Sequence, residues 1–180
     1  MSEFETYSNE LLASSKQFLE EAKSSGAKGE KQRKLRAGLT HAFFFLEAQL
    51  NCLAFHFSSF PEFSVIELSL LSERDVVLQK GRFILTDRPK FFRLEERIEF
   101  LLARFSSDME NAKGTWFGGL KSSIKVRNQL VHPKDAHILE VKDVENAILA
   151  VLGCLSALYQ AIFGKSFPPS ALGLHLGPDG

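Results

Sequence analysis

The sequence predicts an all-α protein, a single-domain bundle of four to five main helices. Apolar side chains recur at three- and four-residue steps along most of the chain, which is the period of one face of an α-helix. No long segment has the two-residue alternation that indicates strands. The 180 residues suit one domain, and an apolar content of 44% is enough to fill its core.

We expect the helical domain over residues 1–165 and a loosely structured C-terminal tail over 166–180. The periodicity predicts helices at about 2–25, 30–59, 91–106, 119–131 and 141–163. In the first helix, Ser2 with Glu5 is a capping-box pattern. The second opens basic and then becomes apolar on almost every face, so we expect a central core helix or an oligomer interface, ending at Pro61.

The segment at about 60–90 is predicted to be a variable insertion. Ser64 with Glu67, and Ser72 with Asp75, are capping patterns that predict two short helices. The residues at 82–85 are expected to form a short extended piece, followed by a turn at Arg88-Pro89.

The two C-terminal helices have clear ends. The fourth, at about 119–131, stops at His132-Pro133, because proline disfavours helical geometry in the residue before it. The last, at about 141–163, ends at Gly164. A loop is predicted ahead of the fourth helix at three glycines, Gly114, Gly118 and Gly119.

Composition narrows the function classes. The 22 basic and 22 acidic residues balance, which argues against indiscriminate binding of polyanions. The charges are nevertheless unevenly distributed, because residues 111–134 contain five basic residues and no acidic one. A localised RNA-binding site therefore remains compatible with the sequence. We expect a cytoplasmic protein that does not engage a membrane, because no secretory signal or membrane-length apolar run is evident. Cys52 and Cys154 have no metal-site spacing and are expected to pack in the core.

Arg127 lies near the centre of the apolar arc of the fourth predicted helix, where a guanidinium is costly unless it is paired or open to a cleft. In one interpretation it is a structural ion pair with an acid on another helix, such as Glu47 or Glu145. In the other, Arg127 and His132 face a shared cleft, where the arginine grips a phosphate and the histidine exchanges protons. Lys121, Lys125, Asn128 and His132 follow one another along one edge of the same helix.

The heptapeptide RNQLVHP at 127–133 closely resembles the signature of the HEPN domains (higher eukaryotes and prokaryotes nucleotide-binding), in which an arginine precedes a histidine by five positions and is often followed by Asn, Asp or His. Arg36 and His41 have the same spacing, but they lie inside the long second helix. The copy at 127–133 instead ends at a helix terminus and precedes one long apolar helix, as in the family.

The resemblance implies a helical bundle that usually forms a homodimer and brings two such motifs together. Many members are metal-independent endoribonucleases that act as toxins or defence proteins, some of them neutralised by an antitoxin; others are noncatalytic modules. Carried over, Arg127 would hold the scissile phosphate, His132 would act as general acid or base, and Asn128 would orient the motif or contact RNA. No metal and no cofactor is implied.

Three other basic residues and one histidine complete the candidate site. Lys121, Lys125 and Lys134 are expected to bind substrate phosphates, and His137, on the connector after the motif, is a candidate for reaching the same cleft. A coincidental motif on an unrelated helical bundle is the third alternative.

Overall fold

The computed structural model describes residues 3–57, 62–169 and 173–176, with no description of the Glu5 side chain. The elements in these ranges follow the order α1 (Glu3–Ser24), α2 (Lys28–Phe57), α3 (Val65–Ser72), β1 (Arg74–Gln79), β2 (Arg82–Pro89), α4 (Leu94–Phe105), α5 (Met109–Val131) and α6 (Val141–Phe163). Helices predominate, which confirms the predicted class in its coarse form. Pro61, and Ser2 of the first capping pattern, lie outside the described residues.

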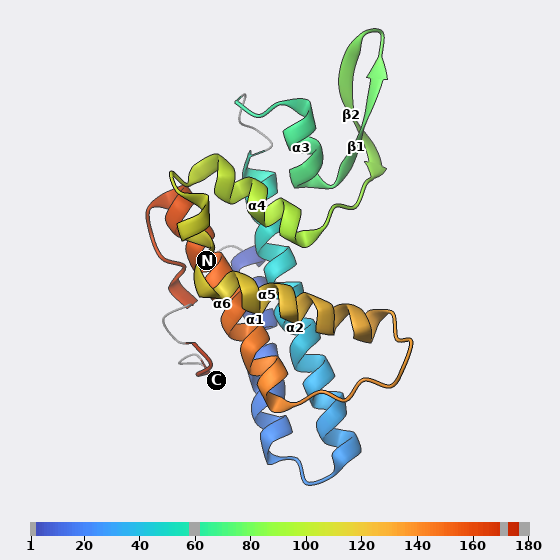
Figure 1. The fold of residues 1–180 in the computed structure, drawn as a ribbon, viewed down its shortest axis with the longest axis vertical. Helices are drawn as coiled ribbons and strands as arrows, with labels where there is room; N and C mark the ends of the chain where they lie inside the picture. The colour runs from blue at the N-terminus through green and yellow to red at the C-terminus, as the bar shows by residue number, and fades with distance from the viewer. Residues whose placement is uncertain (1–2, 58–61, 170–172, 177–180) are drawn as a thin grey trace.

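α2 is the centre of the bundle. α1 folds back along it, α6 runs beside it, and α5 crosses with its C-terminal end projecting sideways (Figure 1). The side chains of α2 that are at most 1% exposed are Leu35, Leu39, Ala42, Phe43, Phe45, Leu46 and Leu50. The expectation of a central core helix is therefore confirmed for the part of α2 that follows its basic first turns, because an apolar helical face is stable only when it is covered.

α6 is long and apolar enough to cross a membrane by length and composition. Its apolar stripe, which includes Val144, Ile148, Val151 and Leu155, is fully buried against the other helices. Cys154 lies within this stripe, and burial raises the pKa of its thiol far above the ordinary value. This cysteine is therefore a small core residue, as expected.

The segment at about 60–90 contains a β-hairpin. The extended piece predicted at 82–85 is confirmed as part of β2, but the pairing strand β1 was not predicted, and the turn predicted at Arg88-Pro89 is wrong because both residues belong to β2. Ser64 and Glu67 form the predicted capping box at the start of α3, but Ser72 ends that helix instead of capping another. β1 and β2 pair antiparallel around Lys80-Gly81, both with positive φ (49° and 77°), which is the geometry of a tight type I′ turn. Each strand has one short apolar run, at 76–78 and 83–85, in place of a two-residue alternation, and Lys-Gly is a weaker hairpin signal than Asn-Gly.

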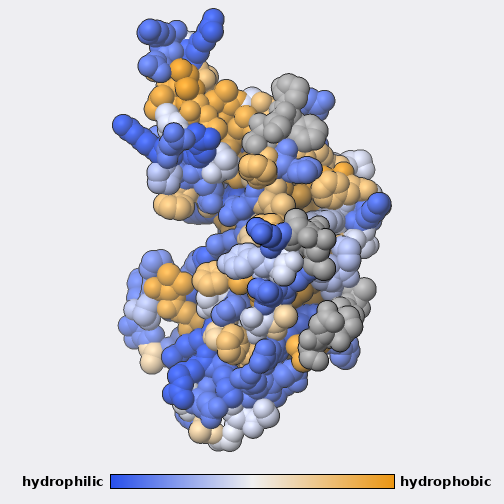
Figure 2. Space-filling view, turned by 180° about the vertical axis from the view of Figure 1, so that it is seen from behind, coloured by the Kyte–Doolittle hydropathy of each residue, from blue (hydrophilic) through white to orange (hydrophobic). Residues whose placement is uncertain are grey.

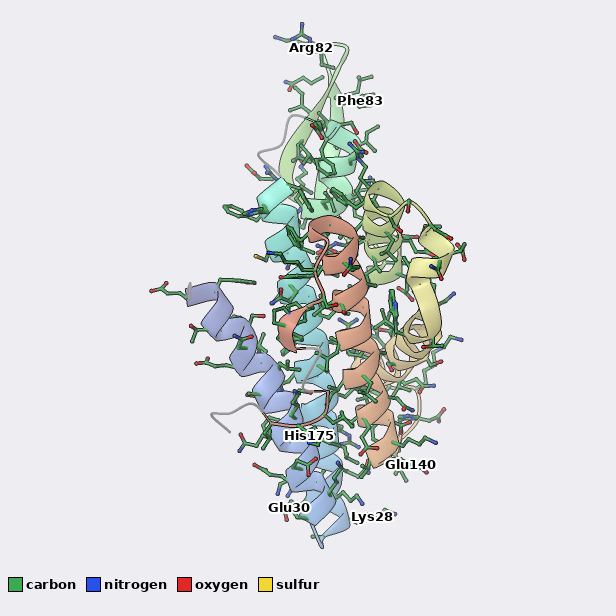
Figure 3. The ribbon with its side chains drawn as sticks, turned by 90° about the vertical axis from the view of Figure 1, so that its left-hand side faces the viewer. Lys28, Glu30, Arg82, Phe83, Glu140 and His175 are labelled. Carbon is green, nitrogen blue, oxygen red and sulfur yellow. The ribbon has the colours of Figure 1, made fainter. Side chains whose placement is uncertain are left out.

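The hairpin forms one extreme of the molecule. Arg82 and Phe83 lie near its tip, at the opposite end of the molecule from the first turn of α2, which carries Lys28 and Glu30 (Figure 3). Leu78 pairs with Phe83 across the strands, and the two side chains are 67% and 56% exposed. The rear view shows apolar surface gathered at this end, and a hollow between it and the projecting end of α5 (Figure 2).

Arg97 of α4 connects the hairpin end to the bundle. Its side chain is only 4% exposed and pairs with Glu73 at 3.1 Å. The same guanidinium donates to the Asn51 side chain on α2 at 2.8 Å and to the Leu71 carbonyl at the end of α3 at 2.9 Å. Desolvation lowers the pKa of Arg97, while Glu73 acts in the opposite direction. One cation therefore joins three elements.

The predicted glycine loop is confined to one residue. α5 begins earlier than predicted, at the Asp108 N-cap, and Gly118 and Gly119 are helical. Only Gly114 departs from helical geometry, with φ 47° and ψ −160°, and it produces a kink. Glycine alone adopts this region without strain, so the kink depends on that residue.

The described parts of 166–180 contact the bundle through Phe167, Leu174 and the His175 carbonyl. Phe167 is buried, and its ring centroid lies 4.7 Å from that of Tyr159. Lys16 donates to the His175 carbonyl at 2.7 Å, and burial lowers the pKa of this lysine.

We expect Gly114→Ala to lower the free energy of unfolding by about 1–3 kcal/mol, because alanine is strained at this positive φ. Gly118→Ala is the matched control: its added Cβ meets no atom within 4 Å in a helical position, so it should stabilise by up to about 1 kcal/mol. Chemical denaturation measures both. Equal effects of the two substitutions would contradict the proposed kink.

Arg97→Ala should lower the free energy of unfolding by about 3 kcal/mol, since it removes an ion pair and leaves buried acceptors without a donor. Arg104→Ala, at an exposed position on α4, should cost less than about 1 kcal/mol. Urea denaturation compares the two variants, and a loss below that of the control would show that Arg97 does not join the elements.

Candidate functional site

The projecting end of α5 carries the predicted motif. The helix ends at Val131, and His132 is its C-cap, with its backbone N–H donating to the Asn128 carbonyl at 2.9 Å. Pro133 lacks a backbone N–H and cannot continue the helix, so the chain turns into the connector that leads to α6. The predicted stop at His132-Pro133 is therefore confirmed.

An open pocket of about 530 Å³ lies beside this helix end. Its lining comes from the last turns of α5 and from the connector, and comprises Lys125, Asn128, Gln129, His132, Lys134, Asp135, Ala136 and His137. The fold thus brings together four of the six predicted site residues, those at 125, 128, 132 and 134. It also adds His137, the candidate for reaching the same cleft.

The far end of the connector is clamped to α2. The Gln32 side chain donates to the Leu139 carbonyl at 2.7 Å and accepts from the Leu139 N–H at 2.9 Å. Leu139 is itself 2% exposed. His137, two residues before this clamp, is half-buried, whereas its neighbours at 134–136 are exposed. The connector is therefore tied down at both ends of the stretch that lines the pocket.

The pocket is rich in groups that bind anions. Lys125 and Lys134 contribute two cations against one carboxylate, Asp135, and none of these three side chains forms an ion pair with another described residue. Two imidazoles and the Asn128 amide add further hydrogen-bonding groups. This arrangement suits a phosphate group and offers side chains that can carry protons.

Arg127 lies apart from the residues that line the pocket. Its Nη2 contacts the Glu47 carboxylate of α2 at 2.5 Å, and its guanidinium lies 5.6 Å from the centre of the Phe43 ring. Nη1 donates to the Asn128 side chain at 3.3 Å, so Asn128 connects Arg127 to the pocket. Of the two acids considered as partners, Glu47 is the observed one, whereas Glu145 pairs with Lys23 at 3.0 Å.

Lys121 is also outside the pocket lining. Its ammonium lies 5.5 Å from the centre of the Phe117 ring, further back along α5. Along the predicted helix edge, only the last three members, Lys125, Asn128 and His132, reach the pocket. A helical wheel groups these residues along one edge of the helix, but it does not show that the pocket extends only along the turns next to the connector.

Two residues involved in arginine contacts, Phe43 and Arg97, were not identified as important from the sequence. Phe43, whose ring lies under Arg127, stands within a run of apolar residues, so nothing in the sequence distinguishes it from its neighbours as a partner of the arginine. Arg97 was detectable by the signal that singled out Arg127, because it lies between Leu94 and Leu101 on an apolar helical stripe. Among the described residues, no three His, Cys, Asp or Glu side chains gather in a metal-binding arrangement.

Comparisons with family models, with curated proteins and with solved structures found no match to this chain.

Proposed function

We propose that the protein is a metal-independent endoribonuclease of the HEPN type, with the pocket at the end of α5 as its active site. The observation that carries this proposal is the gathering of Lys125, Asn128, His132 and Lys134 around one open pocket. A phosphate group is the ligand that this combination of cations and hydrogen-bond donors fits best. The activity suits a toxin or defence protein controlled by an antitoxin.

The proposed reaction cleaves RNA through its own ribose. The 2′-oxygen attacks phosphorus, the bond from phosphorus to the 5′-oxygen breaks, and the products are a 2′,3′-cyclic phosphate and a 5′-hydroxyl end. One proton leaves the 2′-hydroxyl and one is delivered to the 5′-oxygen, so the site needs proton carriers and phosphate-binding cations. His132 is the proton carrier in this proposal, and Lys125 and Lys134 neutralise the phosphate.

Arg127 is proposed to hold the scissile phosphate. Its side chain is 32% exposed, and it already contacts Asn128, which lines the pocket. To reach the phosphate, the guanidinium exchanges its Glu47 contact for the phosphate oxygens, which accept charge-assisted hydrogen bonds from an arginine as a carboxylate does. A homodimer that places two such motifs side by side would strengthen the local positive field.

A noncatalytic HEPN-like module that binds a nucleotide, a nucleic acid or a partner protein is the second candidate. The ion pair between Arg127 and Glu47 favours it, because a guanidinium held by a carboxylate and an aromatic ring on α2 already has a structural role. In that case the motif fixes α5 against α2, and the pocket binds without cleaving.

For the catalytic proposal, we expect the purified protein to cut single-stranded RNA in the presence of EDTA and to leave 2′,3′-cyclic phosphate ends. His132→Ala should lower the rate by about 10²–10⁴-fold, the usual contribution of a general acid or base. His56→Ala, at an exposed position on α2, is the matched control and should cut normally. Gel analysis of a labelled RNA measures the rates, and intact RNA with well-folded protein would reject this proposal.

For the structural alternative, a double-mutant cycle on Arg127 and Glu47 is informative. Both side chains are about one third exposed, so solvent screening limits the expected coupling to about 0.5–1 kcal/mol. Lys125→Ala, on the exposed side of α5, should change stability by less than about 0.5 kcal/mol. Purely additive losses in urea denaturation would contradict a structural pair. Loss of cleavage in Arg127→Ala at unchanged stability would support the catalytic candidate instead.

A further inference from the structure

The pocket at the end of α5 contains two histidines from one chain. His132 caps the helix, and His137 lies five residues later on the connector, so both line the same volume of about 530 Å³. RNA cleavage through the 2′-oxygen requires two proton transfers, one from the attacking hydroxyl and one to the leaving oxygen. A single imidazole is either neutral or protonated at a given moment, so it cannot act as base and acid at the same time. A pair of imidazoles, one neutral and one protonated, can supply both functions together.

The position of His137 is more defined than that of an ordinary loop residue. It is half-buried within an exposed stretch, and it precedes Leu139, whose backbone N–H and carbonyl are both bonded to Gln32 on α2. At the other end of the stretch, Pro133 restricts the backbone directly after His132. These two restraints hold the second imidazole on the pocket that the first one lines.

The other side chains of the pocket are suited to phosphate binding more than to proton transfer. Lys125 and Lys134 are cations, Asn128 does not titrate, and Asp135 is the one carboxylate among the lining residues. The two imidazoles are therefore the side chains of this pocket best suited to accept and donate protons.

We propose that His137 is a second catalytic residue, and that His132 and His137 of the same chain share the two proton transfers of RNA cleavage. This inference rests on the proposed ribonuclease function. One imidazole takes the proton of the 2′-hydroxyl as the bond from the 2′-oxygen to phosphorus forms. The other, protonated, gives its proton to the 5′-oxygen as the bond from phosphorus to that oxygen breaks.

The first test uses two RNA substrates, one ordinary and one with sulfur in place of the 5′-bridging oxygen. A thiolate leaves without being protonated, so the sulfur substrate needs the base and not the acid. On ordinary RNA, His132→Ala, His137→Ala and His137→Gln should each cut about 10²–10⁴-fold more slowly. Ile138→Ala, an exposed neighbour on the same connector, is the control and should cut normally.

On the sulfur substrate, one of the two alanine variants should recover to within about tenfold of the wild-type rate, which identifies the acid. Circular dichroism and melting curves check that each variant is folded. The inference would be overturned if the wild-type protein cuts RNA and the His137→Ala variant is fully active. It would also be overturned if both alanine variants fail to cut the sulfur substrate. Either result would leave the proposed function unaffected. A wild-type protein that cuts neither RNA would overturn both.

The second test asks whether the two histidines act from one chain. His132→Ala and His137→Ala proteins are unfolded together, refolded as a mixture and assayed on ordinary RNA. If each site is built from one chain, every site in the mixture lacks one histidine and no activity returns. Recovery of a substantial part of the wild-type rate would show that the histidines come from different chains, which overturns the single-chain assignment.

Discussion

The fold depends on the burial of α2. This helix is thirty residues long, and its apolar part, after the basic first turns, is stable only when other elements cover it. α1, α3, α5 and α6 all pack against it. Two of its polar side chains, Glu47 and Asn51, lie one turn apart and accept the guanidinium groups of Arg127 and Arg97. Because an unpaired guanidinium is costly to remove from water, these contacts help to determine how α4 and α5 are placed on the central helix.

The candidate site follows from that placement. α5 approaches α6 closely at Gly119, where an added Cβ would lie 3.5 Å from Ala150, and its last turns then project beyond the bundle. The connector has to return from this projecting end to the start of α6, and Gln32 fastens it just before it does so. A pocket between a helix end and a returning connector is the geometric result. Its chemistry comes from the basic and imidazole side chains that the two segments contribute.

The residues of the motif divide between two roles in this structure. Arg127 faces the bundle and is held by Glu47 and Phe43, while His132 faces the pocket with Lys125. Asn128 contacts both, since its side chain accepts from Arg127 and also lines the pocket. A change in the position of Arg127 relative to Glu47 would therefore alter the pocket through the side-chain amide of Asn128. A substitution at Arg127 can therefore change both the stability of the fold and the shape of the pocket.

The sequence by itself determined the helical class, the central role of the second helix, the end of α5 at His132-Pro133 and the cluster of basic residues there. These features depend on local periodicity, capping and proline chemistry, which act over a few residues. Only the tertiary structure decided that Glu47 is the partner of Arg127, that His137 joins His132 in one pocket, and that Lys121 does not. The Arg97 contacts with α2 and α3 belong to the same group. Each of them depends on which segments pack together across the chain, and periodicity along one segment does not carry that information.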